Sequence, residues 1–589
     1  MTSDPCRPES PWLLRPSSSA RWEVTEEDPE ATGRLSNGGG VSPLLARILA
    51  ARGFRDHAAV ERFLHPSLAH THDPDRLRDM EEAVERLRLA LERREGICIY
   101  GDYDVDGITA TAILVSALKF VGAQVRPYIP HRLNEGYGLQ VEALRSLAAD
   151  GTRLIVAVDN GVTALEEVEA AVRLGMEVII VDHHEPGPTL PAALAVINPK
   201  RPDCPYPFKD LCAAGLAFKV AHALLRRLRP NVPEAKEHLK SLLDFVALGT
   251  VADVVALVDE NRCFVTYGLE RMRAGARPGL KSLFDVSQVD ARAVDARELA
   301  FKIAPRLNAA GRTDHAVYAL DLLLCREGAP ARELARLLDR FNSDRRDLED
   351  EMTQEALDLI DEAEEQPVII VEHERWHHGV VGIVASRLLD QYYRPTIVLG
   401  VEGEWAKGSA RSVEGFDLVA AFQACRDHLE QFGGHAMAAG LRLRSSAIAA
   451  FRRAIGAYAR ATLDPRRLVR PLRIDTRADP EDITTKNVEA LERMGPFGAG
   501  NPKPLLEIEG YSLLEEPIEV KGRKTPHLKL RLGDGAGGSI WAIGFSLGSR
   551  IGELRRRHRR LRLAATPFIN TWGGKPRVEL ELRDFIVEA

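Results

Sequence analysis

The fold of this chain is decided by residues 96–107, which read Gly-Ile-Cys-Ile-Tyr-Gly-Asp-Tyr-Asp-Val-Asp-Gly. The short apolar run at residues 97–100 predicts a buried strand, and residues 108–120 have the apolar spacing of a helix. Three carboxylates lie between them at alternate positions: Asp102, Asp104 and Asp106. Open α/β sheets bind their ligands at the carboxyl ends of parallel strands, so we expect this acidic loop to belong to a functional site.

The three acidic side chains of the loop predict a divalent cation. Hard ions such as Mg²⁺ and Mn²⁺ prefer carboxylate oxygens, and so many negative charges need a cation beside them. One alternative is a calcium-binding EF-hand, because the loop has the same Asp-x-Asp-x-Asp-Gly opening. That motif needs a helix before the loop and a Glu six residues after Gly107, where this chain has Ile113. A solvated acidic turn remains the second alternative at this point.

The composition is that of a soluble globular protein. The 589 residues suffice for three or four domains, with 45% hydrophobic and 28% charged residues. No apolar stretch approaches the roughly 20 residues of a membrane span, and the first residues lack the pattern of a signal peptide. Seven scattered cysteines without a Cys-x-x-Cys pair indicate reduced thiols rather than a zinc site. We therefore expect a cytoplasmic protein with no membrane partner.

The net charge of −7 is unevenly distributed along the chain. Residues 466–589 contain 23 Lys and Arg against 17 Asp and Glu, so this end is locally basic. Local patches, rather than the charge of the whole chain, attract polyanions. A nucleic-acid partner is therefore compatible with the acidic total.

Composition and periodicity divide the chain into five segments. Residues 1–42 are rich in Ser, Pro and Gly and are expected to be a disordered tail. After a helical lead-in, strands and helices alternate in residues 43–327, which predicts an α/β domain with a mainly parallel sheet. Residues 328–366 are expected to be a long connecting helix, and residues 367–463 a second α/β domain. Short alternating stretches in residues 464–589 predict a small β-barrel.

Three later stretches supply further candidate ligands for the same cation. One strand-like run ends in Val-Asp-Asn-Gly at Asp159, and the next leads into Asp-His-His at residues 182–184. Parallel strands end at one edge of a sheet, so Asp159 and either His183 or His184 are expected beside the acidic loop. Asp253 ends the motif Gly-Thr-Val-Ala-Asp, in apolar surroundings where a carboxylate needs a metal, a partner or a helix cap.

The chain resembles the DHH phosphoesterase family in four motifs that occur in the family's order: Asp-Tyr-Asp-Val-Asp-Gly, Val-Asp-Asn-Gly, Asp-His-His and Gly-Thr-Val-Ala-Asp. Within the family it looks like the single-strand-specific 5′→3′ DNA exonucleases, from about residue 80 to the C-terminus. The resemblance implies two divalent cations, Mn²⁺ or Mg²⁺, with these catalytic ligands: Asp104, Asp106, Asp159, His183 and Asp253. It also implies that Asp159 bridges the ions, that His184 lies near the scissile phosphate, and that Asp102 is an auxiliary ligand.

The resemblance also assigns residues that bind the substrate. They lie in two loops of the first domain and in two glycine-containing motifs of the second, which resembles the DHH-associated domain. The residues are Arg132, Arg306, Asn308, Arg312, Ser409, Arg411, Gly434 and His435. Arg132, Ser409 and Arg411 are expected to bind a terminal 5′ phosphate, and His435 to face the active-site cleft. Helix–strand packing remains an alternative role for the glycines of residues 433–440.

Three further histidines of the second domain do not belong to the family's site. His373 lies in Glu-His-Glu, and His377 and His378 lie in Trp-His-His. The residues that follow them, 379–387, match a stretch of the family. A loop is therefore the expected structure, rather than an independent metal site.

The C-terminal barrel resembles the OB domain of those exonucleases. OB folds hold single strands in a basic groove with aromatic stacking platforms. The candidates for DNA contacts are Lys521, Arg523, Lys524, Lys529, Arg531, Trp541, Phe545, Phe568 and Trp572, and about half of the aromatic residues are expected in the core. Residues 555–562, which read Arg-Arg-Arg-His-Arg-Arg-Leu-Arg, are either a DNA-facing strip or a solvated helix face.

The resemblance, on these residues, implies a two-metal exonuclease that degrades single-stranded DNA from its 5′ end to 5′ mononucleotides, in DNA repair and recombination. The expected partners of this monomeric enzyme are single-stranded DNA, a helicase and a single-strand-binding protein. One alternative is a phosphoesterase for small substrates, which the basic barrel disfavours because such relatives mostly lack it. The other is a non-catalytic single-strand-binding scaffold, which the complete ligand set disfavours.

Overall fold

The computed structural model describes residues 10, 12–14, 20–37, 41–132, 134–362, 364–522, 525–554, 560–571 and 574–588. It consists of two compact units, each built from segments that are distant in the sequence. We call the unit formed by Arg55–Ser343 and Leu491–Lys503 the α/β unit. The composite unit is formed by Met1–Phe54, Asp344–Ala490 and Pro504–Ala589.

The α/β unit contains a sheet of five strands that all run parallel. In their spatial order the strands are β3 Val125–Tyr128, β2 Gly96–Tyr100, β4 Thr152–Val158, β5 Glu177–Val181 and β6 Ala195–Ile197. Parallel sheets are covered on both faces, which explains why the central strands are almost entirely apolar. The predicted α/β fold with a mainly parallel sheet is confirmed.

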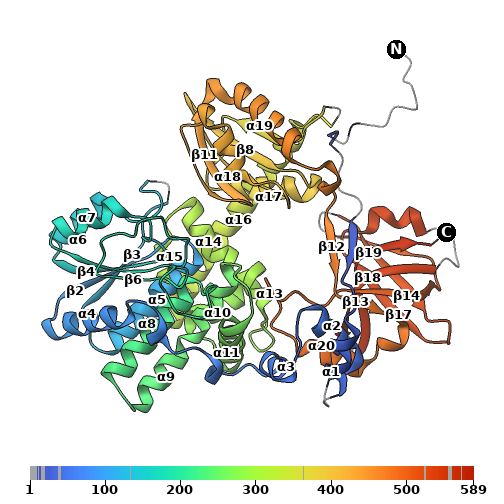
Figure 1. Cartoon of the computed structure of the whole chain (residues 1–589), viewed down its shortest axis with the longest axis horizontal. Coiled ribbons are helices and arrows are strands. Elements are labelled where there is room, and N and C mark those ends of the chain that lie inside the picture. The colour runs from blue at the N-terminus through green and yellow to red at the C-terminus, as the bar shows by residue number, and fades with distance from the viewer. Residues whose placement is uncertain are drawn as a thin grey trace. The chain divides into compact units, whose positions relative to one another are not determined.

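Helices cover both faces of this sheet (Figure 1). From residue 55 to Leu324 the helices of the unit, some of which pack on other helices rather than on the sheet, are α3 His57–Leu64, α4 Met80–Arg93, α5 Val105–Phe120, α6 Val141–Ala149, α7 Leu165–Arg173, α8 Ala213–Leu228, α9 Pro233–Ser241, α10 Leu243–Ala252, α11 Asp259–Gly275, α12 Pro278–Ser287, α13 Ala296–Glu298, α14 Ala304–Thr313 and α15 Val317–Leu324. Successive side chains of a strand point to opposite faces. Ile97 and Ile99 of β2 therefore enter the core shared with α4, α5 and α8, whereas Cys98 and Tyr100 enter the core shared with α6 and α7.

The strand order reverses between β2 and β4. From β2 the chain crosses to β3 at the edge of the sheet, and then passes back over β2 to β4 and on to β5 and β6. Ligands of open α/β sheets bind at the carboxyl ends of the strands on either side of such a reversal. The acidic loop follows β2 and Asp159 follows β4, so both lie at this position.

A single 31-residue helix, α16 Gly328–Asp358, contributes to both units. Ala331 and Leu338 are buried in the core of the α/β unit, and Met352 and Ala356 in a core of the composite unit. The predicted connecting helix is confirmed, although it ends short of the expected boundary. Among the described residues, no helix is both long and apolar enough to span a bilayer.

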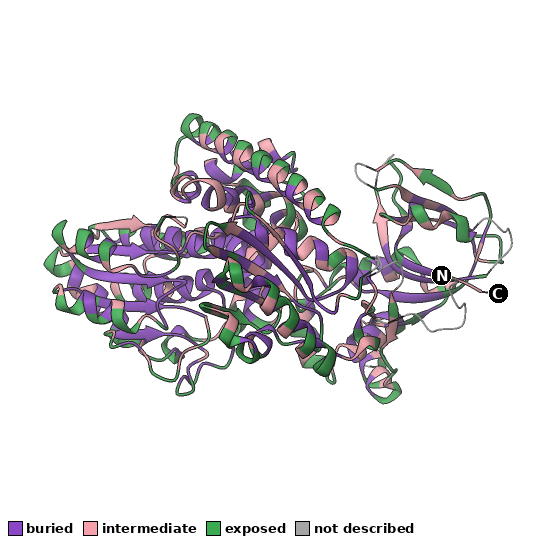
Figure 2. Ribbon diagram, turned by 90° about the horizontal axis from the view of Figure 1, so that it is seen from above, coloured by how far each residue is buried: buried purple, intermediate pink, exposed green. Residues whose placement is uncertain are grey.

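The second α/β domain has a mixed sheet of five strands. In spatial order these are β10 Gln431–His435, β11 Ala438–Arg444, β9 Trp405–Arg411, β8 Thr396–Glu402 and β7 Ile369–His373, and only β7 and β8 pair in parallel. Helix α17 Val381–Tyr392 packs on one face, and α18 Leu418–Ala424 and α19 Ile448–Thr462 pack on the other. In Figure 2 the buried residues of the central strands of the parallel sheet are purple, while outward helix surfaces are green.

The C-terminal domain has a sheet of seven strands. In spatial order they are β13 Thr476–Ala478, β14 Leu506–Leu513, β18 Arg560–Asn570, β19 Arg577–Val587, β17 Ser539–Gly544, β16 His527–Gly533 and β15 Ile518–Val520. A short pairing of β14 with β16 links the two ends of the five-stranded run between them. Helix α20 Thr485–Glu492 precedes these strands, apart from β13. This topology agrees with the predicted OB-type domain.

The predicted disordered tail is wrong for residues 20–37. Strand β1 Arg21–Val24 pairs in parallel with β12 Pro471–Ile474. The indole Nε1 of Trp22 donates a hydrogen bond of 2.7 Å to Asp584 Oδ2. The high content of Ser, Pro and Gly obscured this short strand, whose partners are distant in the sequence.

Two other predicted boundaries differ from the structure. Residues 43–54 belong to the composite unit, in which Arg52 of the turn after helix α2 Pro43–Ala51 pairs with Asp475 at 2.8 Å. Helix α1, residues 29–37, precedes α2 in the same unit. Residues 491–503, predicted within the barrel domain, belong instead to the α/β unit. Composition and periodicity do not record these long-range contacts.

Candidate metal centre and active site

The acidic loop is held in a tight turn between β2 and α5. Asp104 caps α5, because its Oδ1 accepts hydrogen bonds from the amides of Asp106, at 2.9 Å, and Gly107, at 3.1 Å. A Cβ at Gly107 would lie 2.7 Å from Asp102 Cβ, so only glycine fits there. Asn308 Oδ1 accepts from the amide of Val105 at 3.1 Å. The loop conformation is thus fixed both locally and from α14.

Asp106 is fully buried at the first turn of α5. Its carboxylate accepts hydrogen bonds from the amides of Ala213, at 2.6 Å, and Ala214, at 2.9 Å, at the start of α8. The N-terminus of a helix carries a partial positive charge and stabilises a carboxylate. Burial nevertheless raises the pKa of Asp106 to about 6, with a further contribution from the charge of Asp104.

The other three predicted ligands converge on the acidic loop from separate elements. Asp159 follows β4 with a left-handed φ of +63°, His183 follows β5, and Asp253 ends α10. The imidazole Nε2 of His183 lies 3.2 Å from Asp159 Oδ1, 3.7 Å from Asp253 Oδ2 and 3.8 Å from Asp106 Oδ2. The strand ends therefore meet as the sequence predicts.

The donor set fits divalent cations. Ligand atoms lie within 4.8 Å of one another in three overlapping groups: Asp102, Asp104 and Asp159; Asp106, His183 and Asp253; and Asp159, His183 and His184. Within the described part of the chain, the buried Oδ1 atoms of Asp102 and Asp159 have no hydrogen-bond partner. Burial, together with the charge of Asp104, raises the pKa of both these carboxyls well above the usual value. Carboxylate oxygens with an imidazole nitrogen suit Mn²⁺ or Mg²⁺, which would neutralise this charge.

Asp253 adds to this accumulation of negative charge. Burial raises the pKa of its carboxyl to about 8, and the nearby charges of Asp106 and Asp104 contribute. A group with such a pKa is largely protonated at neutral pH unless a cation replaces the proton. The site therefore favours metal binding on electrostatic grounds.

His184 is held by a residue to which sequence reasoning gave no role. Its Nδ1 lies 2.7 Å from Asp182 Oδ1, and Asp182 also accepts from the amide of Val162 at 3.0 Å. Burial disfavours the charged imidazole, but the hydrogen bond to Asp182, together with the negative charges of Asp182, Asp253 and Asp104, outweighs it and raises the pKa of His184. Asp182 belongs to the Asp-His-His triplet, so the signal was present in the sequence.

Tyr137 is a second residue near the site that sequence reasoning did not single out. Its hydroxyl donates a hydrogen bond of 3.1 Å to Asp159 O, and its ring lies edge-on to those of His184 and Tyr103. The guanidinium of Arg132 lies over the Tyr103 ring, 4.8 Å from its centroid. Two aromatic rings and a predicted phosphate ligand are therefore gathered beside the candidate metal ligands.

The predicted ligands on α14 have different environments. Arg306 is buried and donates hydrogen bonds to Asp339 Oδ1, at 2.8 Å, and to Lys302 O, at 2.6 Å. Its guanidinium is used in helix packing, so the structure does not support a phosphate contact by Arg306. Asn308 positions the acidic loop as described above, and a substrate contact by Arg312 stays a prediction.

Within the composite unit, Ser409 and Arg411 lie side by side on β9. Arg411 Nη1 donates to Ser409 Oγ at 2.9 Å and to Ala410 O at 2.8 Å. A Cβ at Gly382, in the first turn of α17, would lie 3.1 Å from Ser409 Oγ and 3.2 Å from Arg411 Nη2. Burial lowers the pKa of Arg411 from its high usual value. A guanidinium, a hydroxyl and a helix N-terminus are thus brought together, as anion sites require.

The glycine motif of this domain forms the hairpin of β10 and β11. Gly434 has φ +135°, and a Cβ there would lie 2.6 Å from Ala438 O. His435 is exposed on the edge strand β10. Strand pairing, rather than helix–strand packing, therefore explains the glycine requirement at Gly434.

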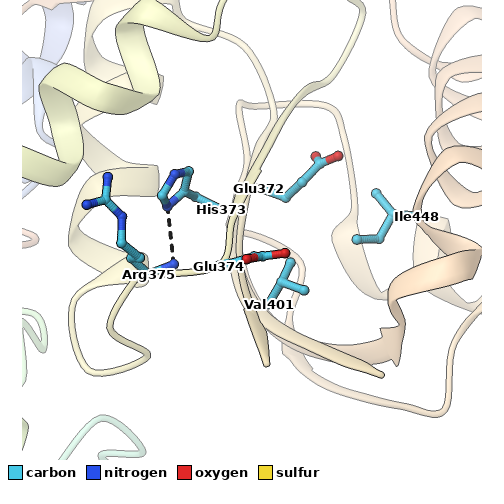
Figure 3. Close-up of a pocket in the computed structure, with 6 residues that line it drawn as sticks. All are labelled: Glu372, His373, Glu374, Arg375, Val401 and Ile448. Carbon is cyan, nitrogen blue, oxygen red and sulfur yellow. Dashed lines mark hydrogen bonds between the residues drawn. The ribbon is translucent and has the colours of Figure 1, made fainter. Parts of the chain in front are cut away.

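A pocket of about 500 Å³ lies at the end of β7 (Figure 3). Its lining residues are Glu372, His373, Glu374, Arg375, Val401 and Ile448. His373 Nδ1 accepts a hydrogen bond of 3.2 Å from the amide of Arg375, and Glu372 pairs with Arg452. His378 Nε2 lies 3.0 Å from Glu402. His373, Glu372 and His378 thus each contact a protein group: the Arg375 amide, Arg452 and Glu402, respectively.

Three family models match successive parts of the chain. They are the DHH family N-terminal domain at residues 96–250, the DHHA1 domain at residues 365–461 and the RecJ OB domain at residues 474–584. The single-stranded-DNA-specific exonuclease RecJ of Bacillus subtilis strain 168 is 39% identical over 574 residues, or 97% of this chain and 71% of that protein. The chain belongs to the RecJ family.

Two solved structures of RecJ from Thermus thermophilus have the same fold. The complex with Mn²⁺ matches with a TM-score of 0.81 and 32% identity, over 96% of this chain and 79% of that one. The complex with Mg²⁺ matches with a TM-score of 0.75 and 31% identity, over 96% and 78%. The acidic cluster of this chain thus occurs in a RecJ fold.

The RecJ OB domain of this chain has a basic and aromatic strip on β16 and β17. Trp541 pairs across the strands with Arg531, and its ring lies 4.6 Å from Lys529 Nζ and 5.0 Å from Arg531 Cζ. Lys521 and Phe545 are exposed. These contacts agree with a surface that stacks bases and binds phosphates.

The remaining predicted barrel contacts fall into two groups. Arg523, Lys524, Trp572 and residues 555–559 lie outside the described residues. Arg560 and Arg562 belong to strand β18, so a helix face is wrong for this end of the arginine run. Arg562 pairs with the buried Glu507. Arg562 therefore stabilises the fold of the domain by neutralising this carboxylate.

Proposed function

We propose that this chain is a metal-dependent exonuclease that hydrolyses single-stranded DNA from the 5′ end to 5′ mononucleotides, in DNA repair and recombination. The observation that carries the proposal is the convergence of four carboxylates and a histidine, from the acidic loop and three further elements, at the reversal of a RecJ-type sheet. Named relatives are single-stranded-DNA-specific exonucleases, which supports the substrate class.

Two divalent cations, Mn²⁺ or Mg²⁺, are the cofactors that we propose for the site. The residues that would hold them are Asp104, Asp106, Asp159, His183 and Asp253, with Asp102 as an auxiliary ligand. When bound, such a pair of ions supplies water activation and charge stabilisation for an in-line displacement at phosphorus. The protein's part is to hold these ligands rigidly, through the Asp104 cap and the α8 amides.

His184 is the group that we assign to the phosphate. Its hydrogen bond to Asp182 fixes the ring and favours the protonated form, in which both ring nitrogens are donors. The Nε2–H can then donate to a non-bridging phosphate oxygen. Arg132, stacked on Tyr103, supplies a second cation in the same unit for a backbone phosphate.

The pairing of Asp182 with His184 leads to a testable expectation. Asp182→Asn removes the charge that favours the protonated ring while keeping the side-chain shape. Partners that orient a catalytic group typically contribute about 10- to 100-fold, so we expect kcat to fall by about that factor with little change in KM. Steady-state kinetics on a 5′-phosphorylated oligonucleotide measures both constants. A larger change in KM than in kcat would contradict the assignment.

Recognition of the 5′ end is the role that we propose for Ser409 and Arg411. A terminal phosphate carries more negative charge than an internal one, and bidentate guanidinium contacts suit it. The neighbouring N-terminus of α17 adds backbone N–H donors. Gly434 and His435 are proposed as further substrate contacts. If the enzyme must bind a terminal 5′ phosphate before it cleaves, cleavage can start only at the 5′ end of the DNA.

We propose that the basic and aromatic strip around Trp541 binds single-stranded DNA outside the metal centre. Stacking of a base on an aromatic ring is worth about 1–3 kcal/mol by alanine substitution. Trp541→Ala should therefore raise KM for a long single strand about tenfold and leave kcat nearly unchanged. A 5′-phosphorylated dinucleotide serves as the control substrate and should be used equally well by both proteins. An unchanged KM on the long strand would show that Trp541 does not bind DNA.

The decisive experiment follows product lengths over time. A 5′-phosphorylated single strand labelled at its 3′ end is incubated with the protein and Mn²⁺, beside a duplex of the same sequence and a reaction with a chelator. We expect a ladder that shortens from the 5′ end, with no reaction on the duplex or without metal. Products that shorten from the labelled end, or activity in the chelator, would contradict the proposal.

The proposed activity also suggests which proteins the enzyme works with. A single-strand-specific exonuclease needs a process that exposes single strands, so a helicase is the fitting partner upstream of it. A single-strand-binding protein shares its substrate and is the second partner. We propose a cytoplasmic monomer, whose mass in solution can be measured by light scattering.

A further inference from the structure

Residues 494–501 form a loop, here called the pinning loop, that packs on the α/β unit although the OB-domain model covers it. Its main anchor is Arg262, in the first turn of α11, which is only 2% exposed. Arg262 donates hydrogen bonds to Met494 O at 2.7 Å, to Gly495 O at 2.6 Å and to Phe63 O at 2.8 Å. These carbonyls satisfy a guanidinium that is withdrawn from water.

The pinning loop is also closed on itself. Asn501 Nδ2 donates to Met494 O at 2.8 Å and to Pro496 O at 2.9 Å. Gly498 and Asn501 exchange backbone hydrogen bonds of 2.9 and 3.2 Å. The loop is therefore a compact element whose shape does not depend on a single contact.

The far side of the pinning loop touches residues 256–257. The amide of Leu257 donates to Ala499 O at 2.8 Å. Gly500 has φ +67°, and a Cβ there would lie 2.7 Å from Ala256 Cβ. A Cβ at Gly498 would lie 2.7 Å from Leu257 Cδ1, at the end of a flexible side chain. The two segments therefore approach as closely as glycine allows.

These pinned residues lie just after Asp253, the carboxylate ligand at the end of α10. Between them Val254 has φ +60° and is 71% exposed. A β-branched residue is rarely found in the left-handed region, and it stays there only when the surrounding structure imposes it. The end of α10 fixes one side of Val254, and the pinning loop fixes the other through Ala256 and Leu257.

Asn261, next to Arg262, extends this support to a second ligand. Its Nδ2 donates to Ala256 O at 3.0 Å and to Asp210 O at 2.7 Å. Residue 210 lies shortly before the start of α8, whose amides bind Asp106. One turn of α11 thus connects the pinning loop with the segments that position both Asp253 and Asp106.

We propose that the pinning loop is a positioning element of the metal centre, which keeps Asp253 in place to bind a cation by holding residues 256–257. The inference rests on the metal site proposed above and adds to it a segment from the start of the OB region. A purely structural loop would affect folding stability, but it would leave the affinity of the folded protein for the cation unchanged.

Gly500→Ala tests the proposal, because the added methyl group pushes directly on Ala256. Outer partners of metal ligands typically contribute about 10- to 100-fold to metal affinity, so we expect Mn²⁺ binding, measured by calorimetry on the full chain, to weaken about tenfold. Gly535→Ala is the matched control, since Gly535 has φ +76° but no described atom within 4 Å of a Cβ. It carries the same backbone strain without a neighbour to displace, and its Mn²⁺ affinity should be that of the wild type.

A size exchange provides the rescue. In Gly500→Ala/Ala256→Gly the methyl group moves to the other side of the contact, and Mn²⁺ affinity should return to within about threefold of the wild type. An equal loss in Gly535→Ala, or no recovery in the exchange variant, overturns the proposal. So does wild-type Mn²⁺ affinity in a folded Gly500→Ala protein.

The outcomes separate this proposal from the function on which it rests. A wild-type chain that binds no Mn²⁺ would refute the proposed metal site itself. If circular dichroism shows that Gly500→Ala does not fold, Asn501→Ser takes its place, because it removes the amide donor that binds Met494 O and Pro496 O and closes the pinning loop. That variant should bind Mn²⁺ several-fold more weakly, and unchanged binding in it would refute the pinning role.

Discussion

Asp159→Asn is expected to abolish DNA cleavage, with a loss of more than about 10³-fold in kcat. Asp159 Oδ1 lies 3.2 Å from His183 Nε2, and its carboxylate belongs to two of the three ligand groups. Because partners that only orient ligands already contribute about 10- to 100-fold, loss of a shared ligand should cost more. Single-turnover cleavage of a 5′-phosphorylated strand at saturating Mn²⁺ measures the effect.

DNA affinity should behave differently from cleavage in this variant. Binding comes mainly from phosphate contacts along the strand, and the substitution removes a negative charge. We therefore expect the Kd for single-stranded DNA, measured in a chelator, to be unchanged or slightly lower. Asp150→Asn, at the opposite end of β4 where Asp150 pairs with Arg126, is the control and should cleave normally. Near-normal turnover of Asp159→Asn would remove the two-metal assignment.

The centre of the site could be predicted because its signal is local. Each strand that ends at the reversal is an apolar run, and its carboxylate or histidine follows within a few residues. Parallel pairing then brings these strand ends together without any further information. The convergence of Asp159 and His183 on the acidic loop follows from this rule alone. Asp253 does not end a strand, and its prediction rested instead on the apolar surroundings of its carboxylate and on the family motif that it ends.

The supporting contacts could not be predicted because they join residues that are distant in the sequence. Nothing near Asp106 indicates that its charge is bound by the amides of Ala213 and Ala214. Arg306 has the surroundings of a phosphate ligand in the sequence, yet Asp339 on α16 takes its guanidinium. Pairing partners of this kind are decided by packing, which periodicity does not encode.

Domain boundaries also depend on contacts between distant residues, and this affects which variant can test the barrel. The pinning loop lies within the segment predicted as the barrel, so truncation before residue 464 would remove it together with the barrel. Arg262 would then keep its buried charge without the carbonyls that satisfy it, which destabilises a protein by several kcal/mol. A point substitution such as Trp541→Ala therefore tests the barrel's role in DNA binding more cleanly than truncation does.

Arg411→Ala is expected to weaken the use of 5′-phosphorylated strands about 10- to 100-fold in kcat/KM. Charge-assisted hydrogen bonds to phosphate contribute about 1.5–3 kcal/mol each before desolvation losses, and about 1.4 kcal/mol corresponds to tenfold. Arg411 lies against Ser409 and the start of α17, and its partial burial reduces the competition of water for its donors. Strands with a 5′ hydroxyl lack the group that Arg411 binds, so their kcat/KM should change much less.

The role of Arg411 is tested by comparing kcat/KM for strands with a 5′ phosphate and strands with a 5′ hydroxyl. Lys407→Ala is the matched control, because Lys407 is an exposed cation on the same strand, β9. A general phosphate contact there would affect both substrates equally, so the ratio of their kcat/KM values should stay at the wild-type level. Arg411→Ala should lower that ratio towards one, because the variant no longer distinguishes the terminal phosphate. An equal proportional loss on both substrates in Arg411→Ala would show that Arg411 binds DNA without reading its 5′ end.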